Sequence, residues 1–192
     1  MKSPADLVLV LLAGCGGGAP DAVDGGPTTD GSAGGADAGD IDGAPGEDFD
    51  MKASDFECIL RWPKVRGFRI TNKLGHENQA VALANANTGG VYPVGTLIQL
   101  VPFEAMIKRR AGFSAATHDW EFFSLSVSSS GTTIRSRGTD TVVNQFGGNC
   151  LSCHSKAMPQ WDLICETNHG CDPLPLTASQ IATLQMNDAR CP

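Results

Sequence analysis

Two cysteines and a histidine that could hold a metal cofactor lie within five positions, as Cys150-Leu151-Ser152-Cys153-His154. A C-x-x-C-H sequence is typical of the covalent attachment of a c-type haem. On a helix these three positions share one face, so the two thiols can join the vinyl groups of one porphyrin while the imidazole binds its iron. The sequence therefore predicts one covalent haem c, attached through Cys150 and Cys153, with His154 as the iron ligand.

Two other chemistries use the same residue types. A thioredoxin-like dithiol is expected among alternating strands and helices with parallel pairing, and the segments around the motif show no such alternation. A zinc site needs a second pair of ligands. Cys165, His169 and Cys171 could supply that pair, but their spacing matches no common zinc motif. Haem attachment is therefore the favoured interpretation.

The remaining cysteines predict disulfides. Seven cysteines are present, and besides the motif pair and Cys15 they are Cys58, Cys165, Cys171 and Cys191. In an oxidising compartment an even remainder suggests two disulfides, with three possible connectivities. We favour Cys165–Cys171, which closes a short loop, and Cys58–Cys191, which ties the two ends of the domain together.

The first fifteen residues have the layout of an export signal. Lys2 precedes an apolar run at 7–12, and residues 12–15 read Leu-Ala-Gly-Cys, which resembles the bacterial lipobox. The resemblance implies that Cys15 is lipidated and that the exported protein is anchored to a membrane, facing the periplasm or the cell surface. The alternative is an ordinary signal in which a cysteine falls at this place, and the short length and Asp6 fit a lipoprotein signal badly.

Composition divides the rest of the chain into a linker and a domain. Residues 16–50 consist almost wholly of small and acidic residues, with nine carboxylates and no Lys or Arg, so we expect a disordered linker. Residues 51–192 hold 13 basic and 11 acidic residues and should form one haem domain. This near balance gives no indication of nucleic-acid binding. No further apolar run approaches the ~20 residues needed to span a bilayer.

Short alternating segments before the motif predict strands, and longer segments after it predict helices. Pro102 should interrupt strand pairing, and residues 103–109 could continue in the same direction after that break. The expected fold is α+β, mainly an antiparallel sheet with a C-terminal haem-bearing helix and short helices. The predicted strands are 65–72, 94–101, 123–128, 132–137 and 140–144, and the predicted helices are 160–166 and 177–186.

Several segments together resemble one known family. Their order is Arg69-Ile70-Thr71-Asn72, Tyr92-Pro93-Val94-Gly95-Thr96, Asp119-Trp120-Glu121-Phe122-Phe123, the C-x-x-C-H and Gln160-Trp161-Asp162-Leu163. Across residues 65–165 this order is similar to the cytochrome P-460 and cytochrome c′-β family. The resemblance implies a mostly β domain with an open distal haem site for nitric oxide or similar small nitrogen compounds and gases. It implies that His154 is the proximal ligand, Arg69 a polar distal residue, and Phe122 or Phe123 a pocket wall.

One position departs from the family pattern. Oxidising members carry a lysine cross-linked to the porphyrin, on the strand that begins with the Gly-Thr pair. Here that strand has no lysine: Leu100 lies about where it is expected, and Lys108 is the only lysine close by in sequence. The departure disfavours hydroxylamine oxidation and favours ligand binding by a haem without this cross-link.

Other candidate residues have simpler interpretations. Met186 is the best-placed second axial ligand for an electron carrier, whereas Met158 lies on the same side as His154. Both methionines, like Met106, are more simply explained as core residues. Glu104 is a candidate proton acceptor in the pocket. The predicted surface or loop histidines are His76, His118 and His169, and the predicted core or haem-packing tryptophans are Trp120 and Trp161.

The expected function is a mono-haem c-type cytochrome with an open distal site for nitric oxide or a similar small ligand. Three alternatives remain: an electron carrier with two axial ligands, a hydroxylamine-oxidising cytochrome, and a haem-free surface module braced by disulfides. A redox partner protein is an expected partner of the redox-active forms.

Overall fold

The computed structural model describes residues 46–192, all of which belong to one compact unit. The predicted signal peptide, the lipidation site Cys15 and residues 16–45 of the predicted linker lie outside the described residues. Within the described part, no helix is both long and apolar enough to cross a membrane.

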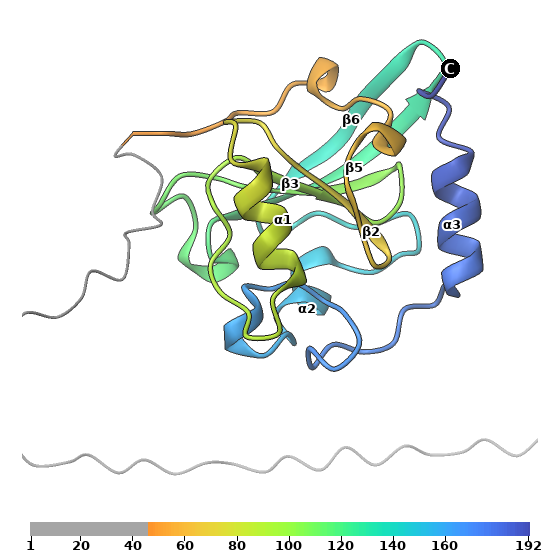
Figure 1. Ribbon diagram of the computed structural model, residues 1–192. Coiled ribbons are helices and arrows are strands. Elements are labelled where there is room, and N and C mark those ends of the chain that lie inside the picture. The colour runs from red at the N-terminus through yellow and green to blue at the C-terminus, as the bar shows by residue number, and fades with distance from the viewer. Residues whose placement is uncertain (1–45) are drawn as a thin grey trace, which may run out of the picture. The chain divides into compact units, whose positions relative to one another are not determined.

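A six-stranded antiparallel sheet with the strands in sequence order, β1-β2-β3-β4-β5-β6, forms the centre of the domain (Figure 1). Such a meander needs only short connections between neighbouring strands. The predicted α+β class is confirmed, with mainly antiparallel sheet and a helix near the C-terminus. The strands are β1 Lys64–Val65, β2 Phe68–Asn72, β3 Thr96–Gln99, β4 Glu104–Lys108, β5 Trp120–Ser128 and β6 Gly131–Gly138. The helices are α1 Glu77–Asn85, α2 Cys150–His154 and α3 Ala178–Met186.

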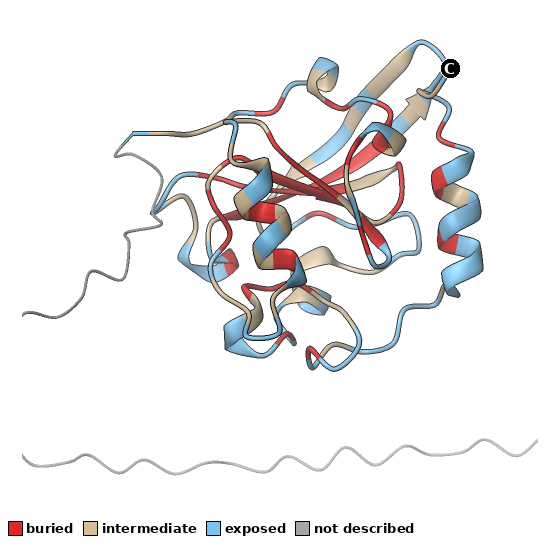
Figure 2. Cartoon of the chain, viewed as in Figure 1, coloured by how far each residue is buried: buried red, intermediate tan, exposed pale blue. Residues whose placement is uncertain are grey.

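Alternation along the strands gives the sheet two apolar faces. We call front face the side that carries Phe68, Ile98, Met106 and Phe122, which pack with residues of α1 and α2. Successive side chains of a strand point to opposite sides. The neighbouring residues therefore form the back face, where Leu97, Ala105, Ile107, Phe123 and Leu125 pack with the N-terminal segment of the domain. Figure 2 shows the central strands buried almost throughout.

Residues 47–50 are part of the domain, although their composition assigns them to the linker. Asp48 accepts hydrogen bonds from Arg109 at 2.8 Å, and Phe49 packs against the back-face core. The hydrogen bond from Arg109 lowers the pKa of Asp48 to about 2. The predicted boundary at Met51 is therefore too late, because the last acidic residues of the segment pair with arginines of the sheet.

Three element predictions are wrong. Residues 103–109 do not continue β3: the chain reverses, and β4 pairs antiparallel to it, with Ile98 opposite Met106. Residues 140–144 form only an isolated bridge, Val143 to Asn149, rather than a strand. Residues 160–166 contain a short 3-10 turn, Pro159–Trp161, instead of a helix. In addition, helix α1 is not predicted from the sequence.

Two disulfides join Cys58 to Cys191 and Cys165 to Cys171, which are the two pairings favoured from the sequence. Beside the first, the Asp188 carboxylate accepts a hydrogen bond from the main-chain N–H of Ile59 at 3.0 Å. The C-terminal segment after α3 is therefore fastened to the start of the domain by both a covalent and a polar contact.

Candidate functional site

The short helix α2 contains the whole C-x-x-C-H motif. Asn149 caps its N-terminus: the side-chain oxygen accepts a hydrogen bond from Ser152 N at 2.9 Å, and the side-chain amide donates to Asp140 O at 2.7 Å. The main-chain N–H of Cys150 also donates to Val142 O at 3.0 Å. A helix this short gains little from its own hydrogen bonds, so these neighbouring contacts fix its position.

All three motif residues line one cavity, which lies between α2 and the front face of the sheet. Its volume is about 140 Å³, and the space free of protein atoms, including the opening to solvent, is about 900 Å³. The sheet contributes mainly apolar side chains, and the loop after α2 contributes the Cys165–Cys171 disulfide and Leu174. The residues of the sheet and of the turn after β3 that line the cavity include Phe68, Ile98, Leu100, Glu104, Met106 and Phe122.

Among the described cysteines, Cys150 and Cys153 alone are free thiols. Burial raises the pKa of Cys150 to about 11, with smaller contributions from Glu104 and Cys153. A reactive dithiol needs a lowered thiol pKa, so the environment of Cys150 argues against thioredoxin-like chemistry.

His154 is held in one tautomer. Its Nδ1 lies 2.7 Å from the main-chain oxygen of Leu163. Because a carbonyl oxygen can only accept, Nδ1 carries the proton and Nε2 keeps the lone pair that a metal requires. Burial lowers the pKa of His154 and so favours the neutral form. The ring of Phe122 packs beside the imidazole, with a centroid separation of 5.2 Å.

Glu104 adds a polar group to this apolar cavity. Burial raises the pKa of its carboxyl group to about 7. Its Oε1 is buried without a hydrogen-bond partner among the described residues. Buried polar atoms are normally satisfied, so Oε1 is free to bond to a molecule held in the cavity. The structure thus brings Glu104 to the site, as predicted from the sequence.

One residue named by the family resemblance points elsewhere. Arg69 follows Phe68 on β2 and therefore faces away from the front core; its guanidinium donates to Trp62 O and Gln185 Oε1, both at 3.2 Å. Phe123 borders the cavity, as the resemblance implies for a pocket wall, and its ring also packs against Phe56 on the back face at 5.2 Å. The correction for Arg69 follows from strand alternation, which sends neighbouring side chains to opposite faces.

Phe122 lines the cavity, as the resemblance implies for a pocket wall, and its ring packs beside that of His154.

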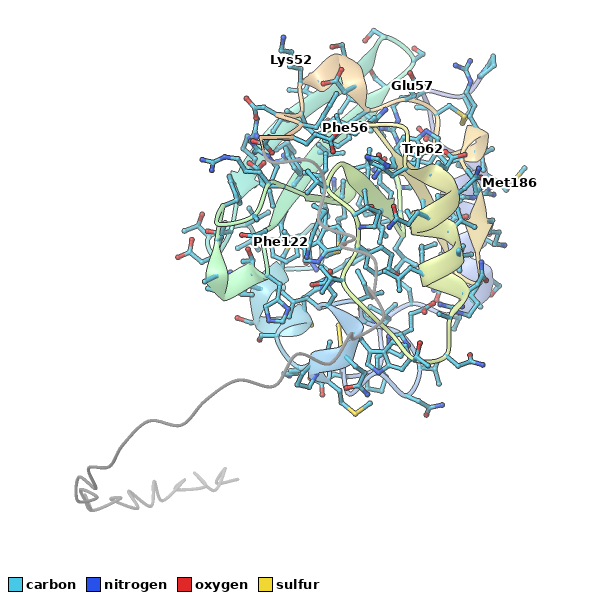
Figure 3. All side chains as sticks on the ribbon, turned by 60° about the vertical axis from the view of Figure 1, so that its left-hand side comes forward. Lys52, Phe56, Glu57, Trp62, Phe122 and Met186 are labelled. Carbon is cyan, nitrogen blue, oxygen red and sulfur yellow. A yellow bond between two sulfur atoms is a disulfide. The ribbon has the colours of Figure 1, made fainter. Side chains whose placement is uncertain are left out.

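The structure also shows where the candidate lysine and methionine positions lie relative to the cavity. Leu100 lines the cavity, whereas Lys108 is buried in an ion pair with Asp162, at 2.7 and 2.9 Å. No lysine lines the cavity within the described part of the chain. Met186 is 68 % exposed and points outward from α3 (Figure 3), so it is neither the core residue that the sequence favours nor a residue of the cavity. Met106 is the methionine that borders the cavity.

The other polar clusters do not offer a metal site. Cys58, Asp188 and Cys191 bring three potential ligand atoms within 4.8 Å of one another, but a disulfide joins the two sulfurs. Cys165 and Cys171 are likewise bonded to each other, which removes the thiolates of the imagined zinc half-site. A sulfur in a disulfide cannot serve as a thiolate ligand.

The histidines predicted at the surface or in loops differ in their environments. His76 precedes α1, and His118 is about half exposed, with Nδ1 3.4 Å from Asp162. His169 lies in a loop but is buried, stacked on Trp161 at 3.8 Å. Trp120 is fully buried in the front core, as predicted from the sequence.

A scan against protein-family models, a search of curated proteins and a search of solved structures each find no match. The similarity to the cytochrome P-460 and cytochrome c′-β family therefore stays a prediction. The residues of this chain alone support the choice of cofactor: two free thiols and a neutral imidazole on one helix, beside a largely apolar cavity, fit a covalently attached haem.

Proposed function

We propose that this protein is a mono-haem c-type cytochrome. Cys150 and Cys153 attach the haem through thioether bonds, and His154 is the proximal ligand of the iron. One observation carries the proposal: the described chain's two free thiols and an imidazole with its Nε2 lone pair available lie on one short helix and line one cavity. In a haem-free surface module there would be no reason to combine these three features.

The proposed activity is the binding of nitric oxide or a similar small ligand at an open distal position. When bound, haem supplies an iron that can take such a ligand and can change its oxidation state. The chain's own residues support this activity by excluding water with apolar side chains and by offering Glu104 as a hydrogen-bonding group. The exposure of Met186 removes the most obvious competitor for the sixth position.

A second candidate is an electron carrier with two axial ligands, and one specific observation favours it. The side chain of Met106 is 4 % exposed and borders the cavity that the haem would enter. Thioether sulfur is a common second ligand in electron-carrying cytochromes. In that case the physiological partner would be a redox protein. Hydroxylamine oxidation has less support, because Lys108 is committed to Asp162.

The same proposal includes export and a lipid anchor at Cys15. The two disulfides support export, because such bonds persist in oxidising compartments and are rare in the cytosol. Radiolabelled fatty acid fed to cells should appear in the wild-type protein and be absent after Cys15→Ser. Equal labelling of both proteins would contradict the anchor.

The distal site is tested by absorption spectra of the full chain produced in a host that matures c-type cytochromes. The reduced protein should bind carbon monoxide and change its spectrum. Met186→Leu, which alters an exposed side chain, is the matched control and should behave like the wild type. A reduced low-spin spectrum that ignores carbon monoxide would contradict the open site and favour the electron carrier.

A further inference from the structure

The carbonyl group that orients His154 belongs to an unusual two-residue turn. Asp162 and Leu163 follow the 3-10 turn Pro159–Trp161, and both have positive φ values, 48° and 62°. This left-handed conformation is unfavourable for residues that carry a Cβ atom, so it persists only where surrounding contacts impose it. The main-chain oxygen of Leu163, at the second of these residues, accepts the hydrogen bond from His154 Nδ1.

A hydrogen bond from Ile164 N to Trp161 O, at 2.8 Å, closes the turn, and its long-range contacts converge on Asp162. Its carboxylate is buried and accepts hydrogen bonds from Lys108 Nζ at 2.7 and 2.9 Å and from the main-chain N–H of Tyr92 at 3.0 Å. Its main-chain oxygen accepts a hydrogen bond from Trp120 Nε1 at 2.8 Å. Strand β4, strand β5 and the loop before β3 therefore each hold this residue.

The ion pair between Lys108 and Asp162 is nearly inaccessible, with side-chain exposures of 5 % and 3 %. Burying two charges has a large desolvation cost that their attraction recovers only in good geometry, so stability alone is a weak explanation for such a pair. Lys108 Nζ also donates to His118 O at 2.6 Å. The pair fixes one main-chain conformation at the point where the chain meets the imidazole.

We propose that Asp162 and Lys108 are positioning residues, which hold the turn so that the Leu163 carbonyl fixes the tautomer and orientation of His154. The part of this inference that concerns iron rests on the proposed function. A histidine whose second nitrogen donates to a carbonyl oxygen is a stronger and better oriented metal ligand. Asp162 and Lys108 would thereby control the strength of a bond between His154 and iron through the Leu163 carbonyl group.

The first test needs no haem. Nitrogen-15 NMR of the full chain, produced without haem maturation, reports which imidazole nitrogen of His154 carries the proton. The wild type should show the Nδ1-protonated tautomer as the dominant form. Asp162→Asn should convert this signal to a mixture in which that tautomer is the minority.

The second test uses the haem-loaded chain. In the ferrous form, the iron–histidine stretching band in the resonance Raman spectrum should move to lower frequency in Asp162→Asn. The reduction potential should rise, because a weaker histidine ligand stabilises the ferric state less. If Asp162→Asn does not fold, the double variant Lys108→Met with Asp162→Asn leaves no lone buried charge and should show the same shifts.

The matched control is Glu121→Gln. It breaks a second buried charge cluster, formed by Glu121 with Arg109 and Arg137, but Glu121 alternates with Trp120 and Phe122 and faces the back of the sheet. Glu121→Gln should destabilise the protein yet leave the tautomer and the Raman band unchanged. Wild-type values in Asp162→Asn, or equal shifts in Glu121→Gln, would overturn the inference. A wild type that shows the tautomer but never attaches haem would overturn the proposed function alone.

Discussion

At the scale of single residues, the site combines two free thiols with an imidazole whose tautomer a carbonyl group fixes. Burial raises the pKa of the Cys150 thiol and lowers that of His154, so it favours the uncharged form of both groups. Glu104 is also buried, and its Oε1 has no hydrogen-bond partner among the described residues.

Glu104 should make the stability of the haem-free protein fall as the pH rises. The pKa of Glu104 is about 7 in the folded protein and has the ordinary value of 4.5 in the unfolded chain. Between pH 4.5 and pH 7 the folded protein therefore binds a proton at Glu104 that the unfolded chain does not bind. The stabilising effect of that proton is complete below pH 4.5 and is lost as the pH passes through 7. Denaturant unfolding should show that Glu104→Gln flattens this dependence, by on the order of 3 kcal/mol at most.

The control for this effect is Glu57→Gln, at a surface position in the N-terminal segment (Figure 3). It should leave the slope of stability against pH as in the wild type. Identical slopes in wild type and Glu104→Gln would show that the carboxyl group titrates normally.

Met106→Leu separates the two candidate functions. If the distal position is open, this volume-conserving change should leave the spectrum and carbon monoxide binding unchanged and cost less than about 1.5 kcal/mol of stability. A change from a low-spin to a high-spin spectrum in the variant would show that Met106 is an axial ligand.

At the scale of elements, α2 depends on its cap. Asn149 both caps the helix and donates to Asp140 O, so Asn149→Ala should lower the free energy of unfolding by ~1 kcal/mol or somewhat more. Asn149→Asp keeps the capping oxygen but loses the donated hydrogen bond. Its free energy of unfolding should therefore lie between those of the wild type and Asn149→Ala. Urea unfolding of the three proteins checks the order, and equal stabilities would contradict the role of the cap.

What the sequence could predict depends on the range of the interactions involved. The capping box at Thr177 and Gln180 is local, and it begins helix α3 within the predicted helical segment 177–186. The turn at Asp162 and Leu163 depends on Lys108, 54 positions away. The local pattern of residues 160–166 predicts a helix because it contains no sign of this distant contact. Helix α1 is not predicted from the sequence although it is as long as α3, because its N-cap residue His76 makes no side-chain cap hydrogen bond and so leaves no capping box in the sequence.

Strand β5 shows the same limit for side-chain direction. Its first six residues are all buried, so alternation of apolar and polar residues could not tell which of Phe122 and Phe123 faces the cavity. Arg69 was misassigned for a related reason, since position in a motif does not determine the face of the sheet. The chemistry of the C-x-x-C-H segment could be read locally because all its groups lie on one turn of helix.

At the scale of the whole molecule, the disulfide Cys58–Cys191 closes a loop across nearly the entire domain, with a sequence separation of 133. The double variant Cys58→Ser with Cys191→Ser should lose roughly 2–5 kcal/mol of stability. Neither cysteine lines the cavity, so the absorption spectrum of the haem-loaded protein should not change. A lost or altered spectrum in a folded variant would show that the haem site depends on this remote bond.

The most direct test of the account is the intact mass of the full chain purified from a host that matures c-type cytochromes. We expect an increase equal to one haem that persists after denaturation, with Cys150 and Cys153 resistant to alkylation. The double variant Cys150→Ala with Cys153→Ala should show no such increase in mass. A wild-type mass without haem, with both thiols open to alkylation, would contradict the central claim.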